Sequence, residues 1–412
     1  MINASLARLA DYPFTRLAQL LEPLALPGGV APLALSVGEP QHAPPVLLAE
    51  TLAASADGWN RYPQVNGTPA LREAIAGWLK RRYRLGDGAI DPDRSILPLS
   101  GTREGLFLLA QLAAPGEPTD RTPAVLLPNP FYAAYEGAAV IAGAEPVFLD
   151  ATAATGFLPD LDALDRDLLD RTRLFYLCTP ANPQGVAADA AYLERAIGLA
   201  RRHGFILAVD ECYAEIYDRT PPTGALEVAA RMDGGALDNL LVFHSLSKRS
   251  NAAGLRSGFV AGDPRLIAAF AQLRSYAMAG MPLAIQAASA ALWNDDKHVE
   301  ENRARYRAAF DAAHQAIGDR FGFYRPDGGF FLWLDVGDGE KAARDLWRAE
   351  GLRVLPGAYI TRPDPAGRNH GAPYIRVALV HDAAIVADAM ARLTAHLDAR
   401  PEQHPADRRT GS

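Results

Sequence analysis

The chain contains 412 residues, of which 49% are hydrophobic, and it carries a formal net charge of −7 at pH 7. This length exceeds what one small hydrophobic core needs, so we expect a large sheet-based domain with a smaller companion. The negative balance lacks the basic surface that a nucleic-acid backbone requires, which argues against a nucleic-acid partner.

The sequence also indicates a cellular location. No run approaches the roughly 20 apolar residues that a membrane span requires, and the amino-terminal stretch contains Asp11 and no signal-peptide core. We therefore expect a cytoplasmic protein without a membrane partner. Cys178 and Cys212 each lie within an apolar run. This favours buried thiols over a disulfide or a metal site, and no metal is predicted.

The first 45 residues are predicted to form an arm. They contain a helix-patterned segment, TRLAQLLEPL, and they end at Pro44 and Pro45, which interrupt regular structure. We expect residues 1–45 to pack against the smaller domain or against a neighbouring subunit.

A large α/β domain is predicted over residues 46–290. Short apolar runs alternate there with helix-patterned segments, as expected for parallel strands joined by helical crossovers. Seven strands are predicted, at residues 95–100, 124–128, 146–149, 173–178, 205–210, 241–246 and 258–262. The segments 102–114 and 189–204 are the clearest helices, and Gly204 is a plausible C-cap of the second.

A smaller α+β domain is predicted over residues 291–398. It begins with the charged amphipathic helix NRARYRAAFDAAHQAIGDRF, continues with the strand-like runs GGFFLWLDV and YIRVALV, and closes with a last helix. The polar segment 399–412 has no periodicity and is predicted to be a disordered tail.

Lys248 carries the strongest chemical signal. It follows the apolar strand candidate LLVFH, within SLSKRSNAAGLRSG. A lysine at a strand end can hold its amine over a pocket, where partial desolvation lowers its proton affinity and makes it a Schiff-base nucleophile. A solvated loop lysine is the common alternative, so the interpretation depends on neighbouring motifs.

Several motifs could bind a phosphate group beside this lysine. Ser245 and Arg256 flank it with a hydroxyl and a planar cation. The segment SGTRE joins a predicted strand to a predicted helix, so its backbone amides and the positive helix end suit an anion. Ordinary turn chemistry is the alternative for this segment.

Other polar and aromatic residues lie at or near the ends of predicted strands. Asp210 could keep a pyridine nitrogen protonated, with a helix N-cap as the alternative. Tyr213 and Asn182 could reach a phenolic ring oxygen, and Tyr132 could stack on a flat ring. Arg376, on a carboxyl-terminal strand, would bind a substrate carboxylate or form an internal salt bridge.

Taken in order, eight segments resemble the class I/II aminotransferases of pyridoxal 5′-phosphate (PLP) fold type I. They are SVGEP, NRYPQVNGTPALREAI, SGTRE, PNPFY, TPANPQG, VDECYAEIY, SLSKRSNAAGLRSG and YIRVAL. The resemblance spans roughly residues 12–395. It implies an α/β fold with a large, mostly parallel seven-stranded sheet domain, helices on both of its faces and a smaller α+β domain. It also implies a homodimer with shared active sites.

The resemblance assigns a role to each candidate residue. Lys248 would be the Schiff-base lysine and proton carrier, Asp210 the partner of the pyridinium nitrogen, and Tyr132 the stacking aromatic. Asn182 and Tyr213 would donate to the ring's O3′. The implied phosphate contacts are Gly101, Thr102, Arg103, Ser245 and Arg256, with Tyr62 reaching in from the other subunit; the implied substrate contacts are Arg376, Gly38 and Asn182.

The implied reaction takes an amino group from glutamate, leaving 2-oxoglutarate, and gives it to a keto acid. The stretches LADYPFTRLAQLLEP, LSVGEPQHAPP and SLSKRSNAAGLRSGFVAGD are most similar to the proteobacterial N-succinyl-diaminopimelate aminotransferases of lysine biosynthesis. Arg103 or Arg249 would then bind a distal carboxylate. Cis peptide bonds are implied at Asn129-Pro130 and Asn182-Pro183.

Other functions stay open. Another class I/II aminotransferase with aspartate, alanine or aromatic donors would use the same motifs, and so would a PLP-dependent C–S lyase. A transcription regulator with an aminotransferase-like sensor domain is disfavoured, because about ten residues precede the first family-like motif and leave no room for a helix-turn-helix domain.

Overall fold

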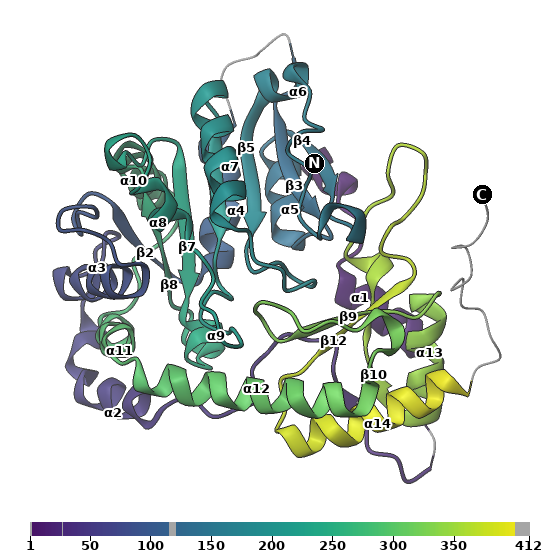
Figure 1. The fold of residues 1–412 in the computed structure, drawn as a ribbon. Helices are drawn as coiled ribbons and strands as arrows, with labels where there is room; N and C mark the ends of the chain where they lie inside the picture. Colours follow the sequence, from purple (N-terminus) through teal and green to yellow (C-terminus); the bar gives the residue numbers. More distant parts are fainter. Residues whose placement is uncertain (1, 27, 115–120, 400–412) are drawn as a thin grey trace.

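The computed structural model describes residues 2–26, 28–114 and 121–399. Two sheet-based units lie side by side, and the long helix α12 (Lys297–Ile317) runs along one side of both in Figure 1. None of the helices in these ranges has the length and apolar character needed to cross a membrane. The domain limits at residues 45, 290 and 398 stay predictions, and the tail predicted up to residue 412 lies, from residue 400 on, outside the described residues.

The larger unit is built on a seven-stranded sheet, which confirms the predicted fold class. Its strand order is β2, β8, β7, β6, β5, β3, β4. Strand β8 runs antiparallel to both of its neighbours, and all other neighbouring strands are parallel. All seven predicted strands are present: β2 (Ile96–Leu99), β3 (Ala124–Asn129), β4 (Glu145–Asp150), β5 (Thr172–Cys178), β6 (Ile206–Asp210), β7 (Leu240–Ser245) and β8 (Gly258–Gly262).

Helices connect these strands. The predicted helices at 102–114 and 189–204 are confirmed as α4 and α7, and α7 ends at Gly204 in the left-handed conformation expected of a C-cap glycine. Besides α12, the described α-helices are α1 (Pro13–Leu21), α2 (Val46–Ala54), α3 (Pro69–Tyr83), α4 (Thr102–Ala113), α5 (Ala133–Ile141), α6 (Arg166–Arg171), α7 (Ala190–His203), α8 (Ala225–Ala229), α9 (Leu246–Arg249), α10 (Pro264–Ala277), α11 (Leu283–Asn294), α13 (Gly339–Glu350) and α14 (Ala383–Asp398).

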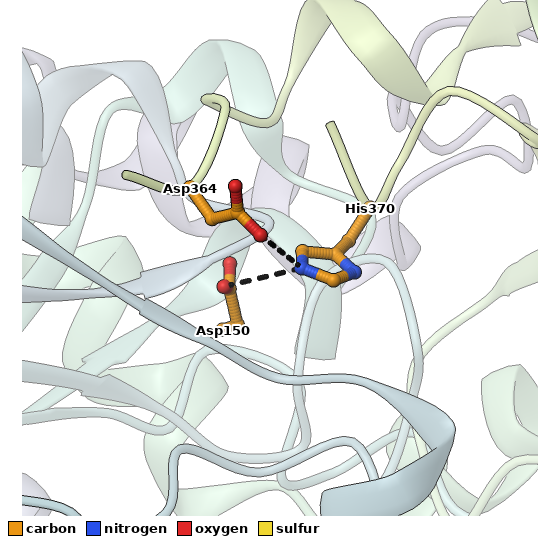
Figure 2. A group of neighbouring side chains, drawn as sticks. All are labelled: Asp150, Asp364 and His370. Atoms are coloured by element: carbon orange, nitrogen blue, oxygen red, sulfur yellow. Dashed lines mark hydrogen bonds and ion pairs between the residues drawn. The ribbon is translucent and has the colours of Figure 1, made fainter. Parts of the chain in front are cut away.

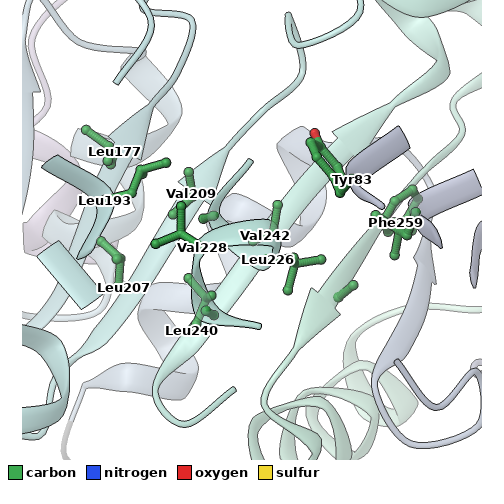
Figure 3. Packing of buried hydrophobic residues seen from close by; sticks show 14 of the residues in the cluster. Tyr83, Leu177, Leu193, Leu207, Val209, Leu226, Val228, Leu240, Val242 and Phe259 are labelled. Carbon is green, nitrogen blue, oxygen red and sulfur yellow. The ribbon is translucent and has the colours of Figure 1, made fainter. Parts of the chain in front are cut away.

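Alternate residues of the strands fill two separate cores, because successive side chains of a strand point to opposite faces. Leu207 and Val209 of β6 pack with α3, α7, α8 and α11, and Figure 3 shows this core. Ile206 and Ala208 of the same strand pack on the other face with α4, α5 and α10. The sheet therefore has helices on both faces, and the strand ends are left to form a site.

The smaller unit is built on an antiparallel sheet of β11 (Leu355–Pro356), β12 (Tyr374–Ala378) and β9 (Phe331–Asp335). Strands β9 and β12 confirm the two runs predicted there, and α12, α13 and α14 share a core with them. A short parallel pair, β1 (Leu33–Ala34) and β10 (Leu352–Arg353), joins the amino-terminal arm to this unit. The two-residue strands are absent from the prediction because they are too short to show alternation.

Ion pairs between side chains link the two units at the end of β4. His370 Nε2 lies 3.1 Å from Asp364 Oδ2 and 3.5 Å from Asp150 Oδ2, so the imidazole joins the two carboxylates (Figure 2). Asp150 also accepts a hydrogen bond from the Asn129 side chain at 2.7 Å. These three acid and imidazole side chains are residue types that bind metals, but existing hydrogen bonds and ion pairs explain their arrangement.

Candidate active site

A cavity of about 650 Å³ lies where the carboxyl ends of the large-sheet strands face the small sheet. Strand ends of an open α/β sheet are the usual position of ligand sites. Most of the predicted site residues line this cavity: Gly38, Thr102, Arg103, Tyr132, Asn182, Asp210, Tyr213, Ser245, Lys248, Arg256 and Arg376.

Lys248 lies on α9, a single turn that begins where β7 ends. The Ser245 hydroxyl caps this turn by accepting a hydrogen bond from the Ser247 amide at 3.1 Å. The Lys248 amine donates to the Gly38 carbonyl and lies 5.3 Å from the centre of the Phe330 ring. Burial lowers the pKa of Lys248 to about 8, because desolvation disfavours the charged form. This amine is therefore more often uncharged, and more nucleophilic, than an exposed lysine.

Gly101 and Arg256 meet at one end of the cavity. Gly101 precedes α4 with a φ of +87°, which favours glycine, and a Cβ at this position would lie 2.1 Å from Nη2 of Arg256 and displace that guanidinium. Arg256 donates to the Ala253 carbonyl at 2.9 Å and has no carboxylate partner in the part of the chain described. Together with the Ser245 hydroxyl and the amino end of α4, this guanidinium fits a phosphate group.

Asp210 ends β6 and is 7% exposed. Its carboxylate accepts hydrogen bonds from the Tyr135 hydroxyl at 2.7 Å and from the Cys212 amide at 3.2 Å. Among the described residues no lysine, arginine or histidine forms an ion pair with it. A buried carboxylate in this state fits a cationic ligand group such as a protonated pyridine nitrogen.

Tyr135 is a site residue that the sequence analysis missed. Its ring stacks on Tyr176 with ring centres 4.5 Å apart and planes 6° from parallel. Burial raises the pKa of Tyr135 well above its ordinary value, so the hydroxyl stays protonated and can donate to Asp210. The available signal was its position three residues after Tyr132, since residues i and i+3 share a helix face.

Arg376 of β12 is buried on the opposite wall. Its Nη1 donates to the Asn182 side chain at 3.1 Å and its Nη2 to the Ser36 carbonyl at 2.7 Å, and the guanidinium lies 4.4 Å from the centre of the Phe331 ring. Its Nε has no hydrogen-bond partner, and no described carboxylate pairs with it. Burial lowers the pKa of Arg376 to about 10. The internal salt bridge considered as an alternative is therefore not what holds this cation.

Asn182 and Arg103 each link two parts of the site. The Asn182 amide lies 3.5 Å from the Tyr213 hydroxyl, so it connects Tyr213 with Arg376. The Nε of Arg103 donates to the Tyr132 hydroxyl, and its Nη2 lies 3.5 Å from the Tyr12 hydroxyl. The peptide bonds Asn129-Pro130 and Asn182-Pro183 are cis as predicted, and Thr179-Pro180 is cis as well.

Three predicted residues do not line the cavity: Gly101 lies behind the Arg256 guanidinium, and Tyr62 and Arg249 lie elsewhere. Tyr62 is 98% exposed, so this chain does not bring it to its own site. Arg249 is buried elsewhere: it donates to the Leu292 carbonyl at 2.7 Å and pairs with Asp296 at 2.9 Å. The proposal that Arg249 binds a distal carboxylate is therefore wrong, because its guanidinium is committed to structural partners away from the cavity.

The fold and this site define a class of protein. Residues 31–393 match the family model for aminotransferase class I and II. The chain belongs to this family, and it is a PLP-dependent aminotransferase of fold type I. The turn at Gly101 and the Arg256 guanidinium fit the phosphate of that cofactor, and the Asp210 carboxylate, which forms no ion pair with a described residue, fits its ring nitrogen.

Two relatives and one solved structure show which aminotransferases the chain is similar to. The chain is 36% identical to the 4-dedimethylamino-4-oxo-anhydrotetracycline transaminase OxyQ of Streptomyces rimosus, over 90% of this chain and 94% of that protein. It is 31% identical to an LL-diaminopimelate aminotransferase of Desulforudis audaxviator, over 93% and 95% of the two chains. A crystal structure of an aminotransferase from Neisseria meningitidis superposes with a TM-score of 0.91 at 40% identity and covers 96% of this chain and 99% of that one. These names support an aminotransferase and not, by themselves, the N-succinyl substrate.

Proposed function

We propose that the protein transfers the amino group of glutamate to N-succinyl-2-amino-6-oxopimelate, forming N-succinyl-LL-2,6-diaminopimelate. The observation that carries the transamination is the buried Lys248 amine, which shares one cavity with Asp210 and Arg376. Two observations support a diaminopimelate substrate. One is the identity to the LL-diaminopimelate aminotransferase of Desulforudis audaxviator. The other is the similarity of the amino-terminal arm and of the segment around Lys248 to N-succinyl-diaminopimelate aminotransferases.

The chain's own residues would hold the cofactor in one orientation. PLP, when bound, supplies an electron sink for the negative charge that develops at the substrate α-carbon. Arg256 and Ser245 are placed to bind its phosphate, and Asp210 is placed to keep a proton on its ring nitrogen. Tyr213 and Asn182 would donate to the ring oxygen.

Lys248 would act twice. Its amine would hold the cofactor in the resting protein and, when free, would accept the proton from the substrate α-carbon. Arg376 would bind the α-carboxylate, which supplies the anion that this buried cation lacks. Gly38 lets the Phe331 ring, which lies beside Arg376, pack directly against the backbone, since a Cβ at Gly38 would lie 2.4 Å from that ring.

Arg103 is the remaining candidate for the distal carboxylate of either substrate. It lines the cavity, and its hydrogen bonds to Tyr12 and Tyr132 hold the guanidinium at the wall without neutralising it. A planar cation with free donors is suited to bidentate carboxylate recognition.

The experiment that tests this function follows the visible absorbance of the purified protein during titration with glutamate. Conversion of the bound cofactor to its aminated form establishes the half-reaction. Repeating the titration with N-succinyl-LL-diaminopimelate, LL-diaminopimelate, aspartate and alanine ranks the donors by kcat/KM. A donor other than N-succinyl-LL-diaminopimelate with the highest value would replace the proposed substrate and leave the reaction class intact.

A C–S lyase is separated by its products. Release of pyruvate and ammonia from cystathionine without a keto acid would show that reaction, whereas amino transfer requires an acceptor. We expect no such release above the rate without enzyme.

A further inference from the structure

A second groove, of about 660 Å³, lies away from the cofactor cavity. One wall is the loop Tyr217–Arg219, which follows β6, and the other is the face of α12 that carries Arg303 and Arg307, with Arg325 at the end. Four arginines and three acidic side chains line it. The groove thus joins a segment of the large unit to the long helix and to the small unit.

Arg303 is the most buried of these cations, at 9% exposure. Its guanidinium lies 4.1 Å from the centre of the Tyr217 ring, and its Nη1 lies 3.5 Å from the Glu215 carbonyl. No described carboxylate lies within ion-pair distance of it. A buried guanidinium with one long hydrogen bond and no anion is costly unless something else supplies the negative charge.

Arg307 lies one turn further along α12, four residues from Arg303. Like-charged side chains at this spacing on a helix repel each other. Arg307 Nη1 donates a hydrogen bond to the Asp218 carbonyl at 3.2 Å, and none of the described carboxylates pairs with Arg307. Two adjacent cations on one helix face therefore share an uncompensated charge.

The acidic side chains of the groove do not supply that compensation. Asp218 and Asp311 both pair with Arg325, at 3.0 Å and 2.6 Å. Glu300 is exposed, and it forms no ion pair with Arg303 or Arg307. The Nε of Arg325 is itself buried without a hydrogen-bond partner. The guanidinium groups of this groove therefore have N–H donors that lack negatively charged oxygen acceptors.

We propose that this groove is a binding site for a small oxyanion, a phosphate group or a carboxylate, held between the guanidinium groups of Arg303 and Arg307. Charge-assisted hydrogen bonds from two arginines suit both chemistries. The two units already meet beside this groove, where Tyr217 forms a β-bridge with Gly328 and the Gly329 amide donates to the Ile216 carbonyl at 2.7 Å. A bound oxyanion would add a further connection between the units.

Isothermal titration calorimetry of the holoenzyme tests the site. The bound cofactor's own phosphate occupies the anion site at Arg256 and Ser245, and the variants of α12 distinguish binding in the groove from binding of an added anion at Arg376. Titrations with phosphate and with tricarballylate, at constant ionic strength, distinguish the two sources of oxyanion. We expect saturable binding of at least one of them, one per chain, with a dissociation constant in the millimolar range or tighter.

Variants of α12 locate the binding. Arg307→Gln, at a half-buried position, should weaken it by roughly tenfold, and Arg303→Gln by at least as much. Arg305→Gln is the matched control, because Arg305 is exposed on the same helix and does not line the groove. The site is refuted if neither anion gives saturable heat, if Arg307→Gln binds as the wild type does, or if Arg305→Gln loses binding equally.

Discussion

Burial sets the reactivity of Lys248. Because the pKa of its amine is lowered to about 8, the uncharged form becomes the major one above that pH. In cofactor-free protein we expect the rate of covalent PLP attachment to rise with pH and to level off above about pH 8, since the neutral amine is the nucleophile. Stopped-flow absorbance measures this rate. A rate that keeps rising to pH 10 and beyond would show an amine with the ordinary affinity for its proton.

Arg103 should set the preference for donors with a second carboxylate. Arg103→Ala removes a cation held by Tyr12 and Tyr132 at the cavity wall. We expect the KM for glutamate to rise roughly 10- to 100-fold, as for the loss of a charge-assisted hydrogen bond. The KM for alanine, which has no distal carboxylate, should change little. Equal effects on the two donors would remove Arg103 from this role.

Arg249→Ala provides the contrast to that variant. Its guanidinium is 1% exposed and packs 5.0 Å from the centre of the Trp293 ring. We expect a loss of roughly 2–4 kcal/mol of unfolding free energy, since buried hydrogen bonds and packing are lost together. The ratio of KM values for glutamate and alanine should stay at the wild-type value. Denaturant unfolding and steady-state kinetics on the same preparation separate the two effects.

Sequence patterns place Lys248 at the cavity but do not place the side chain of its neighbour Arg249. Lys248 and Arg249 are adjacent, and both follow the same strand, but successive residues on a helical turn are rotated by about 100°. Lys248 faces the cavity and Arg249 does not, and a single helical turn is too short for any periodicity to place the Arg249 side chain. The positions of Asp210 and Arg376 were predictable because each lies on a strand, where the apolar pattern fixes the element and its end.

At the scale of elements, α12 supports the turn that carries the lysine. Asn302 donates to the carbonyls of Lys248 and Arg249, at 3.2 Å and 3.3 Å. His298 lies 2.8 Å from the Ser250 hydroxyl, immediately after the turn. A single helical turn leaves its last carbonyls unsatisfied, so these side chains complete α9 from outside.

Removal of that support should affect catalysis more than binding. Asn302→Ala is expected to lower kcat by roughly tenfold, because a small displacement of Lys248 misplaces the proton acceptor. The KM for glutamate and the amount of bound cofactor should be nearly unchanged. Glu301→Ala, exposed on the same helix, is the control. A fall in kcat/KM with kcat unchanged would argue that Asn302 does not position the lysine.

Element prediction succeeded where a run was long enough to show its period. Each of the seven large-sheet strands contains at least four residues, and burial on both faces makes most of them continuous apolar runs, with the half-buried edge strand β4 as the exception. Strands β1 and β10 contain two residues each, and a strand of two residues is too short to show a periodic pattern. The small unit's strand partners are set by contacts across the chain, so they could not be derived locally.

At the scale of the whole molecule, we propose that two copies of this chain share their active sites. Tyr62 is 98% exposed in the single chain, and the family resemblance places it at the partner's phosphate site. Mixing Lys248→Ala with Tyr62→Ala protein should then create hybrid dimers in which one site has both residues intact. We expect activity to rise above that of either variant alone, with a species near twice 44.2 kDa by light scattering. No gain on mixing would contradict shared sites.

Distance along the chain has a consequence for biosynthesis. The carbonyl that orients Arg376 belongs to Ser36, 340 positions earlier, so the two ends of the polypeptide must meet before the substrate arginine is held. A ribosome-bound fragment can complete the large sheet but not this contact. The cofactor contacts of the large unit can form earlier, but the substrate carboxylate can be bound only after translation has nearly finished, so nascent chains should be inactive however much cofactor the cell contains.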